Sequence, residues 1–205
     1  MSQRETVFIV DDDAAIREGL SNLLEAVGVV SETFPCAEDF LRHWDPGRPG
    51  CLVLDARLPG MTGVEFQEKL NSSAIHIPII FMTAHGDVPM VRKVMKAGAI
   101  EFLTKPFEKQ ELLVAIEHAF AQDRARRAED AAVAPIRARY ESLTPREREV
   151  MQLVTAGLLN KQIAAELELS EIMVKVHRRN VLEKMQAESL ADLVKMTERI
   201  RAVGH

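Results

Sequence analysis

The sequence predicts an α/β domain followed by a small all-α domain, and three observations carry that prediction. Short apolar runs alternate with amphipathic stretches over the first 120 residues, and no strand-like run follows Tyr140. Strands that alternate with helices form a parallel sheet covered by helices on both faces. Residues 1–120 hold 11 Lys and Arg against 18 Asp and Glu, whereas residues 141–205 hold 10 against 10. The acidic part of the chain therefore coincides with the predicted α/β domain, and the part with balanced charge coincides with the predicted all-α domain.

The strand and helix runs of the first half follow one another at even spacing. Expected strands cover residues 7–10, 29–34, 51–55, 78–83 and 100–104, and expected helices cover 14–27, 37–44, 63–70, 88–97 and a stretch from Glu108 onward. We expect a first domain over residues 1–121, a helical linker over 122–139 and a second domain over 140–205. Pro135 is expected to break or kink the linker helix, because proline removes a backbone hydrogen bond.

The second domain is expected to contain four helices. A capping box of Thr144 and Glu147 begins the first helix, Pro145 stands at its first position, and Gly157 ends it. The second helix is expected from Asn160, as its cap, to about Leu167. Ser170 caps the third, which extends to about Met185, and the fourth follows Ser189. Only three residues join the second and third helices, so the pair predicts a helix-turn-helix.

Composition excludes several classes of protein. No apolar run approaches the roughly 18–20 residues needed to span a bilayer, and the N-terminus lacks the apolar core of a signal peptide. Cys36 and Cys51 have no metal-ligand or redox spacing, which is typical of packed thiols in a reducing compartment. We therefore expect a cytoplasmic protein with no membrane partner. The acidic first half is a poor nucleic-acid binder, so any DNA contact has to come from a local patch of the second half.

Polar residues stand at the ends of four of the predicted strands. Asp11 and Asp12 follow the first strand, Asp55 ends the third, Thr83 ends the fourth, and Lys105 follows the fifth. If the sheet has the flavodoxin-like strand order 2-1-3-4-5, these groups converge on one crevice. Three neighbouring carboxylates repel one another unless a cation lies among them, and oxygen-only ligands suit Mg²⁺.

Such a crevice suits phosphoryl chemistry. An aspartate carboxylate can attack phosphorus to form an acyl phosphate, a lysine can pair with a phosphoryl oxygen, and a threonine hydroxyl can donate to another. Each residue also has a structural reading when taken alone. The Asp11–Asp13 run caps a helix in that reading, Thr83 is a capping hydroxyl, and Lys105 is a solvated chain end. Their joint order at strand ends favours the phosphoryl site.

A basic strip lies on the third helix of the second domain. Its core face is formed by Val174, Val181, Leu182 and Met185, and four cations occupy other faces: Lys175, Arg178, Arg179 and Lys184. Such a strip is usually a solvated face. Here it lies on the second helix of a helix-turn-helix, which is the element that enters a DNA major groove.

Residues 5–120 resemble the receiver domain of two-component response regulators. The shared motifs are Val10-Asp11-Asp12, Leu54-Asp55 with Arg57, Pro59-Gly60 and Gly63, Met82-Thr83-Ala84, and Lys105-Pro106. The segment His85-Gly86-Asp87-Val88-Pro89-Met90 is similar to the FixJ branch of the family.

This resemblance implies a set of roles. Asp55 accepts phosphate from a sensor histidine kinase. Asp12, Asp55 and the backbone carbonyl of Arg57 bind Mg²⁺, and Asp11 helps through water. Thr83 and Lys105 contact the phosphoryl group, and the bond before Pro106 is cis. Phe102 stands at the position of the family's switching aromatic, although a simple core role is equally consistent with the sequence.

Residues 140–200 resemble the LuxR/NarL-type DNA-binding domain. The resemblance rests on Leu143-Thr144, Arg146-Glu147, Gly157, Asn160-Lys161, Ile163-Ala164, Leu167, Ser170 and Val174-Lys175-Val176-His177. It implies that Lys175, Val176 and Arg179 contact base edges, while Lys161 and Arg178 contact phosphates. Met173 stands where the family usually has threonine, and Leu159 where it usually has serine, so certain phosphate contacts are weakened.

The two resemblances together predict a non-enzymatic transcriptional regulator of the FixJ/NarL type. Phosphorylation of Asp55 is expected to promote a homodimer that binds double-stranded promoter DNA and acts with RNA polymerase. Two alternatives stay open: a DNA-binding regulator that is independent of phosphorylation, and a Mg²⁺-dependent phosphotransferase with an aspartyl phosphate. The second alternative leaves the helical half of the chain without a role.

Overall fold

The first half of the chain forms a five-stranded parallel sheet in the computed structural model, which describes residues 4–84 and 88–203. The strands are β1 (Thr6–Val10), β2 (Val30–Phe34), β3 (Gly50–Asp55), β4 (Ile79–Thr83) and β5 (Glu101–Thr104). They lie in the order β2-β1-β3-β4-β5, and every neighbouring pair is parallel. The predicted fold class and strand order are confirmed. Every predicted strand ends at the observed residue, and the other predicted bounds in this half differ from the observed ones by two residues at most.

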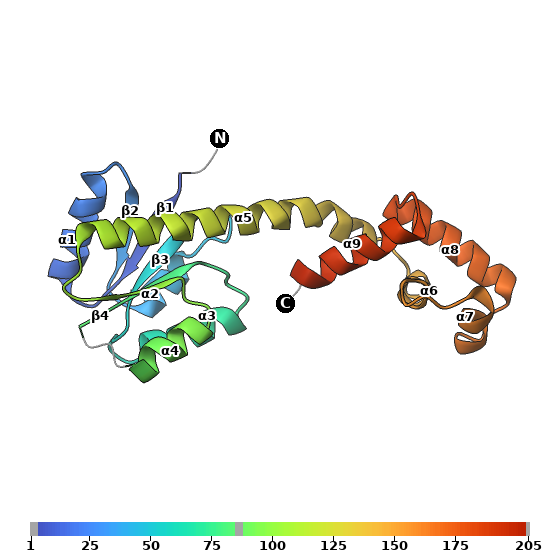
Figure 1. Cartoon of the computed structure of the whole chain (residues 1–205), viewed down its shortest axis with the longest axis horizontal. Coiled ribbons are helices and arrows are strands. Elements are labelled where there is room, and N and C mark those ends of the chain that lie inside the picture. The colour runs from blue at the N-terminus through green and yellow to red at the C-terminus, as the bar shows by residue number, and fades with distance from the viewer. Residues whose placement is uncertain (1–3, 85–87, 204–205) are drawn as a thin grey trace. The chain divides into compact units, whose positions relative to one another are not determined.

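Helices cover both faces of the sheet because the side chains of the strands alternate between two apolar layers. Phe8, Val10, Leu52 and Leu54 point into a core shared with α2 (Ala37–His43), α3 (Gly63–Ser72) and α4 (Val88–Lys96). Val7, Ile9, Cys51 and Val53 point into a second core shared with α1 (Ala14–Glu25) and α5 (Lys109–Glu141). Figure 1 shows the strands of this sheet and the helices that alternate with them along the chain. All strand carboxyl ends therefore meet at one edge.

The helix α5 is continuous from Lys109 to Glu141, with Pro135 inside it. Residues 122–139, which are predicted to be a helical linker, lie within this helix, and the predicted break at Pro135 is wrong. Proline removes one backbone hydrogen bond, but the buried side chains of Val133 and Ile136 lie on both sides of it and stabilise the helix there. The chain divides into two compact units, Met1–Arg126 and Arg127–His205, within this helix.

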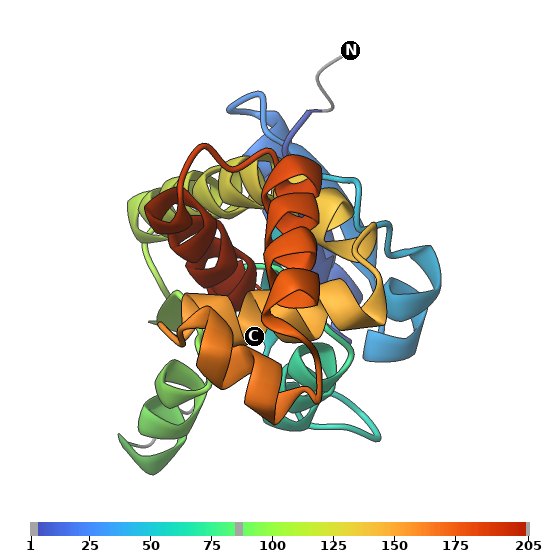
Figure 2. The same ribbon diagram turned by 90° about the vertical axis from the view of Figure 1, so that its right-hand side faces the viewer.

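The second unit contains α6 (Pro145–Thr155), α7 (Asn160–Glu166), α8 (Glu171–Met185) and α9 (Leu190–Val203). As predicted, Thr144 and Glu147 form a capping box at α6, and Ser170 caps α8 by accepting a hydrogen bond from the backbone N–H of Met173, at 3.2 Å. The N-cap of α7 is Leu159 rather than the predicted Asn160. In Figure 2, α7 and α8 lie next to each other as a helix-turn-helix.

Within the part of the chain that the structure describes, no helix is both long enough and apolar enough to cross a membrane.

Candidate functional site

The carboxyl edge of the sheet brings Asp11, Asp55 and Lys105 together. Asp55 is the last residue of β3, while Asp11 follows β1 and Lys105 follows β5. The ammonium of Lys105 donates to Asp11 Oδ2 at 2.7 Å and to Asp55 Oδ1 at 2.8 Å. Asp11 keeps only 1% of its surface exposed and Asp55 keeps 8%. Three residues separated by up to 94 positions thus form one charged group, in which the two aspartates are buried and Lys105 is partly buried.

The remaining carboxylate oxygens are held by backbone N–H groups. Asp55 Oδ2 accepts from the N–H of Arg57 at 2.8 Å, and Asp11 Oδ1 accepts from the N–H of Asp13 at 2.9 Å. Asp13 accepts in turn from the N–H of Ala15 at 2.8 Å and is the N-cap of α1. The capping role that the acidic run suggests therefore belongs to Asp13. Asp12 lies exposed between them.

The charge of Lys105 is fixed by its two partners. Burial by itself lowers the pKa of the ammonium, but the hydrogen bonds and negative charges of Asp11 and Asp55 outweigh it, and the net pKa is raised. Lys105 is therefore a permanent cation at neutral pH. It leaves one negative charge on the group it forms with Asp11 and Asp55.

The start of α3 packs directly behind Asp55. The N–H of Gly63 donates to the carbonyl of Ala56 at 3.0 Å. A Cβ at Gly63 would lie 2.6 Å from the backbone carbonyl oxygen of Asp55 and 2.9 Å from the Phe81 ring, so only glycine fits there. The motif glycine therefore fixes the backbone that carries Asp55.

Thr83 and Phe102 lie on neighbouring strands beside this group. Thr83 ends β4, keeps 2% of its surface exposed, and its carbonyl accepts from the N–H of Lys105 at 2.7 Å. Phe102 is partly buried in β5 against the core that contains Phe81 and Val94. The peptide bond between Lys105 and Pro106 is cis, as the resemblance implies. Residues 85–87, which carry part of the FixJ-like segment, lie outside the described residues.

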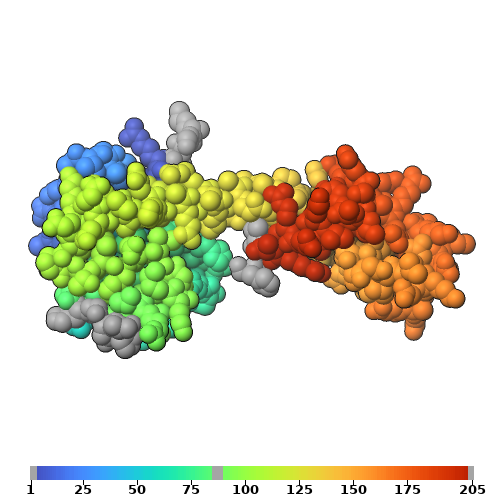
Figure 3. Space-filling model, viewed as in Figure 1, coloured from blue at the N-terminus to red at the C-terminus, as the bar shows by residue number. Residues whose placement is uncertain are grey.

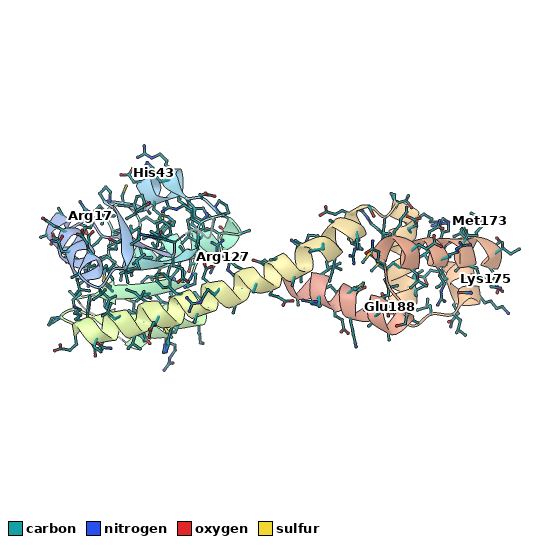
Figure 4. The ribbon with its side chains drawn as sticks, turned by 90° about the horizontal axis from the view of Figure 1, so that it is seen from above. Arg17, His43, Arg127, Met173, Lys175 and Glu188 are labelled. Atoms are coloured by element: carbon teal, nitrogen blue, oxygen red, sulfur yellow. The ribbon has the colours of Figure 1, made fainter. Side chains whose placement is uncertain are left out.

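Sequence reasoning missed Arg17, which braces the acidic loop from α1. One guanidinium nitrogen of Arg17 donates to the backbone carbonyl of Asp11 at 2.7 Å and to that of Asp12 at 2.9 Å. Figure 4 labels Arg17 on α1. The signal in the sequence is an arginine in the second turn of a helix that directly follows an acidic run, but it does not reveal that backbone carbonyls are the partners.

The donor set of the acidic loop and Asp55 consists of oxygen atoms, which fits the preference of Mg²⁺. In residues 4–84 and 88–203, however, no group of three or more His, Cys, Asp or Glu side chains is arranged to hold a metal ion. Lys105 supplies the counter-charge to Asp11 and Asp55, while Asp12 is exposed. The assignment of Asp11, Asp12, Asp55 and the Arg57 carbonyl to a metal stays a prediction.

On the second unit, some of the residues that are predicted to contact DNA are only exposed, and others also pair with neighbouring side chains. Lys161, Lys175 and Val176 are exposed, and Figure 3 shows that α8 contributes to the open surface of this unit. Arg179 is also exposed but pairs with Glu183 at 2.7 Å. Arg178 is partly buried and donates to Asn160 Oδ1 at 2.7 Å, which ties α8 to α7.

The fourth cation of the basic strip, Lys184, is an internal partner. Its ammonium lies 2.6 Å from Glu147 Oε2, and the side chain of Glu147 is only 4% exposed. Burial by itself raises the pKa of Glu147, but the hydrogen bonds from Lys184 and Thr144 outweigh it and lower the pKa to about 2. Sequence reasoning placed Lys184 on the basic strip because Glu147 is 37 residues away.

These two units match two protein families. Residues 7–117 match the family model of the response regulator receiver domain, and residues 141–197 match that of the luxR family of bacterial regulatory proteins. The chain belongs to the two-component response regulators with a LuxR-type helix-turn-helix domain. Members of this family are transcriptional regulators rather than enzymes.

Particular relatives resemble the chain over nearly its whole length. It is 49% identical to nodulation protein W of Bradyrhizobium diazoefficiens, with 96% of this chain and 87% of that protein covered. It is 41% identical to the transcriptional regulatory protein FixJ of the same organism, with 97% of each covered. Among solved structures, the response regulator StyR has a TM-score of 0.70 at 52% identity over 96% of this chain and 99% of StyR. Full-length FixJ from B. japonicum has a TM-score of 0.58 at 40% identity over 98% of this chain and 99% of that one.

Proposed function

We propose that the chain is a phosphorylation-controlled transcriptional regulator in which Asp55 accepts a phosphoryl group and α8 reads promoter DNA. The observation that carries this proposal is the shared ammonium of Lys105, which holds Asp11 and Asp55 in one buried group at the carboxyl edge of the sheet. A sensor histidine kinase is the donor that a receiver domain implies.

The reaction is a transfer between two side chains. One oxygen of the Asp55 carboxylate forms a bond to phosphorus, the bond between phosphorus and the kinase histidine nitrogen breaks, and the electron pair of that bond returns to the imidazole, which then binds a proton. Lys105 pairs with a phosphoryl oxygen and stabilises its charge, and the Thr83 hydroxyl donates to another. Asp11, Asp12, Asp55 and the Arg57 carbonyl would hold Mg²⁺, which would supply positive charge to neutralise the remaining charge.

Phosphorylation adds roughly −1.5 to −2 charge beside two carboxylates that share one ammonium. Thr83 and Phe102 lie on β4 and β5, so a movement toward the phosphate changes the surface formed by α4 and β5. That surface is the proposed dimer interface, and a dimer presents two copies of α8 to half-sites about one turn of DNA apart. On α8 and α7, Lys175, Val176 and Arg179 contact base edges, while Lys161 and Arg178 contact phosphates.

Footprinting of genomic DNA tests the proposal. The full chain and Asp55→Asn are each compared with and without a small-molecule phosphodonor and Mg²⁺. We expect the phosphodonor to strengthen protection at defined sites for the wild type and to leave Asp55→Asn unchanged. Equal binding in all four samples would favour the alternative of a regulator independent of phosphorylation. Beryllofluoride, which mimics the phosphoryl group, should raise the mass of the wild type to that of a dimer; an unchanged mass would contradict the dimer step.

A further inference from the structure

The start of α8 carries a cluster of exposed apolar side chains. Ile172 is 74% exposed, which is the largest value for any large hydrophobic residue in residues 4–84 and 90–202. Val176 is 47% and Met173 is 44% exposed. Figure 4 shows the side chains of Met173 and Lys175 extending from this part of the helix. These exposures are not explained by the core of the unit, which uses Val174, Val181 and Met185.

Ile172 lies on the same face of α8 as the proposed base contacts. Residues three, four and seven positions apart share one face of a helix. Lys175, Val176 and Arg179 stand at these three distances from Ile172. Cores of protein interfaces are depleted in lysine, so an apolar patch that alternates with exposed cations fits a protein partner poorly. It fits DNA, in which apolar and negatively charged atoms lie close together.

We propose that Ile172, with Met173 beside it, selects thymine by contact with its 5-methyl group in the major groove. Thymine is the base that presents a methyl group there, and apolar side chains are the groups that contact it. The N-terminal residues of a recognition helix are those that reach base edges, and Ile172 and Met173 lie in the first turn of α8. This inference rests on the proposed DNA binding and adds a specificity residue to it.

We expect the apolar side chains of α8 to contribute a large share of its base recognition. The guanidinium of Arg179 is engaged by Glu183 at 2.7 Å, so a contact from Arg179 to a base has to replace that ion pair. Ile172 has no polar group to desolvate. Burial of one thymine methyl group is worth about a fourfold change in Kd.

The test removes single methyl groups from the DNA. Duplexes that bind the full chain in the presence of beryllofluoride are selected from a random library, and each thymine of the selected site is then replaced in turn by deoxyuridine, which lacks the 5-methyl group. For the wild type we expect Kd to rise about fourfold at one or two thymines of each half-site. For Ile172→Ala we expect weaker binding to the thymine duplex and no further rise at those positions.

Leu159→Ala is the matched control, because Leu159 is also an exposed apolar residue of this unit but lies outside α8. This variant should keep the full effect of the deoxyuridine substitution. Since Ile172 is highly exposed and alanine is the best helix former, Ile172→Ala should fold as the wild type does.

Three results would overturn the inference. If deoxyuridine does not raise the Kd of the wild type, or raises the Kd of Ile172→Ala by the same factor, then Ile172 does not contact the methyl group. A change in dimer mass with unchanged DNA affinity for Ile172→Ala means that the patch contacts a second copy of the chain. If no DNA motif is selected at all, the proposed DNA binding itself fails, and the thymine contact with it.

Discussion

Lys105 and Lys175 stand at the two predicted sites in opposite surroundings. Lys105 is hydrogen-bonded to two carboxylates and keeps 18% of its side chain exposed. Lys175 is exposed, and it forms no ion pair with any residue that the structure describes. A partly buried lysine that is hydrogen-bonded to two carboxylates is held in one position, which suits recognition of one small group such as a phosphoryl. An exposed lysine on a helix face instead suits a large partner that supplies the opposite charge itself.

The largest effect should follow from removal of the partly buried cation, Lys105. Lys105→Gln is expected to slow phosphorylation of the full chain by a small-molecule phosphodonor about 100-fold, since it removes a fixed charge at the phosphoryl oxygens. Lys109→Gln, at the exposed start of α5, is the control and should react at the wild-type rate. Mass spectrometry of the phosphorylated chain over time measures both. Equal rates in the two variants would show that Lys105 serves only to balance Asp11 and Asp55.

Lys184 should behave as a structural residue although the sequence places it on the basic strip. Lys184→Ala leaves the buried carboxylate of Glu147 without its cation, which is expected to cost about 2 kcal/mol in the free energy of unfolding of the second unit. Denaturant unfolding followed by the fluorescence of Tyr140, the single tyrosine of the chain, measures this. Lys175→Ala is the control and should change the free energy by less than about 0.5 kcal/mol.

The pH dependence of the same ion pair has a defined sign. The pKa of Glu147 is lowered from 4.5 to about 2 in the folded chain. The pair therefore contributes its full stability above about pH 4.5 and loses it as the pH falls toward 2. We expect the difference in free energy of unfolding between wild type and Glu147→Gln to shrink over this interval. A difference that stays constant down to low pH would mean that the carboxylate charge contributes nothing.

Arg17 should have a smaller effect than Lys105, because it acts through the backbone. Arg17→Gln loses the bonds to the carbonyls of Asp11 and Asp12, which is expected to slow phosphorylation about tenfold, the equivalent of about 1.4 kcal/mol. A loop that has lost its brace should also bind Mg²⁺ more weakly, so raising the Mg²⁺ concentration should restore part of the rate. Glu18→Gln, on an exposed neighbour in α1, should leave both properties unchanged. A slow rate that Mg²⁺ does not improve would contradict the positioning role.

The smallest effect is expected at the exposed cation of α7. Lys161→Ala should weaken binding to all DNA sequences alike and reduce the dependence of log K on log salt by about one. It should leave the stability of the second unit unchanged, in contrast to Lys184→Ala. Affinity measured at several salt concentrations separates the two lysines. A loss confined to one base position would instead make Lys161 a base contact.

Much of the fold was predictable because the apolar runs and the capping residues of single segments agree with the elements that these segments form. Continuous apolar runs predicted the buried strands, and the capping residues Thr144 and Ser170 fixed the starts of α6 and α8. The predicted break at Pro135 failed because burial of Val133 and Ile136 outweighs one missing hydrogen bond. The cap of α7 was misplaced by one residue, since the Asn160 side chain accepts from Arg178 rather than from its own helix.

The sequence by itself determined the parallel sheet, the helix-turn-helix and the place of Asp11, Asp55, Thr83 and Lys105 at strand ends. These depend on periodicity and on residues within a few positions of one another. Only the tertiary structure decided which charges are paired. Lys105 with Asp11, Arg17 with the Asp11 and Asp12 carbonyls, and Lys184 with Glu147 are contacts made across the fold. Ion pairs act over a few ångströms of space, and the chain brings those atoms together only when it is folded.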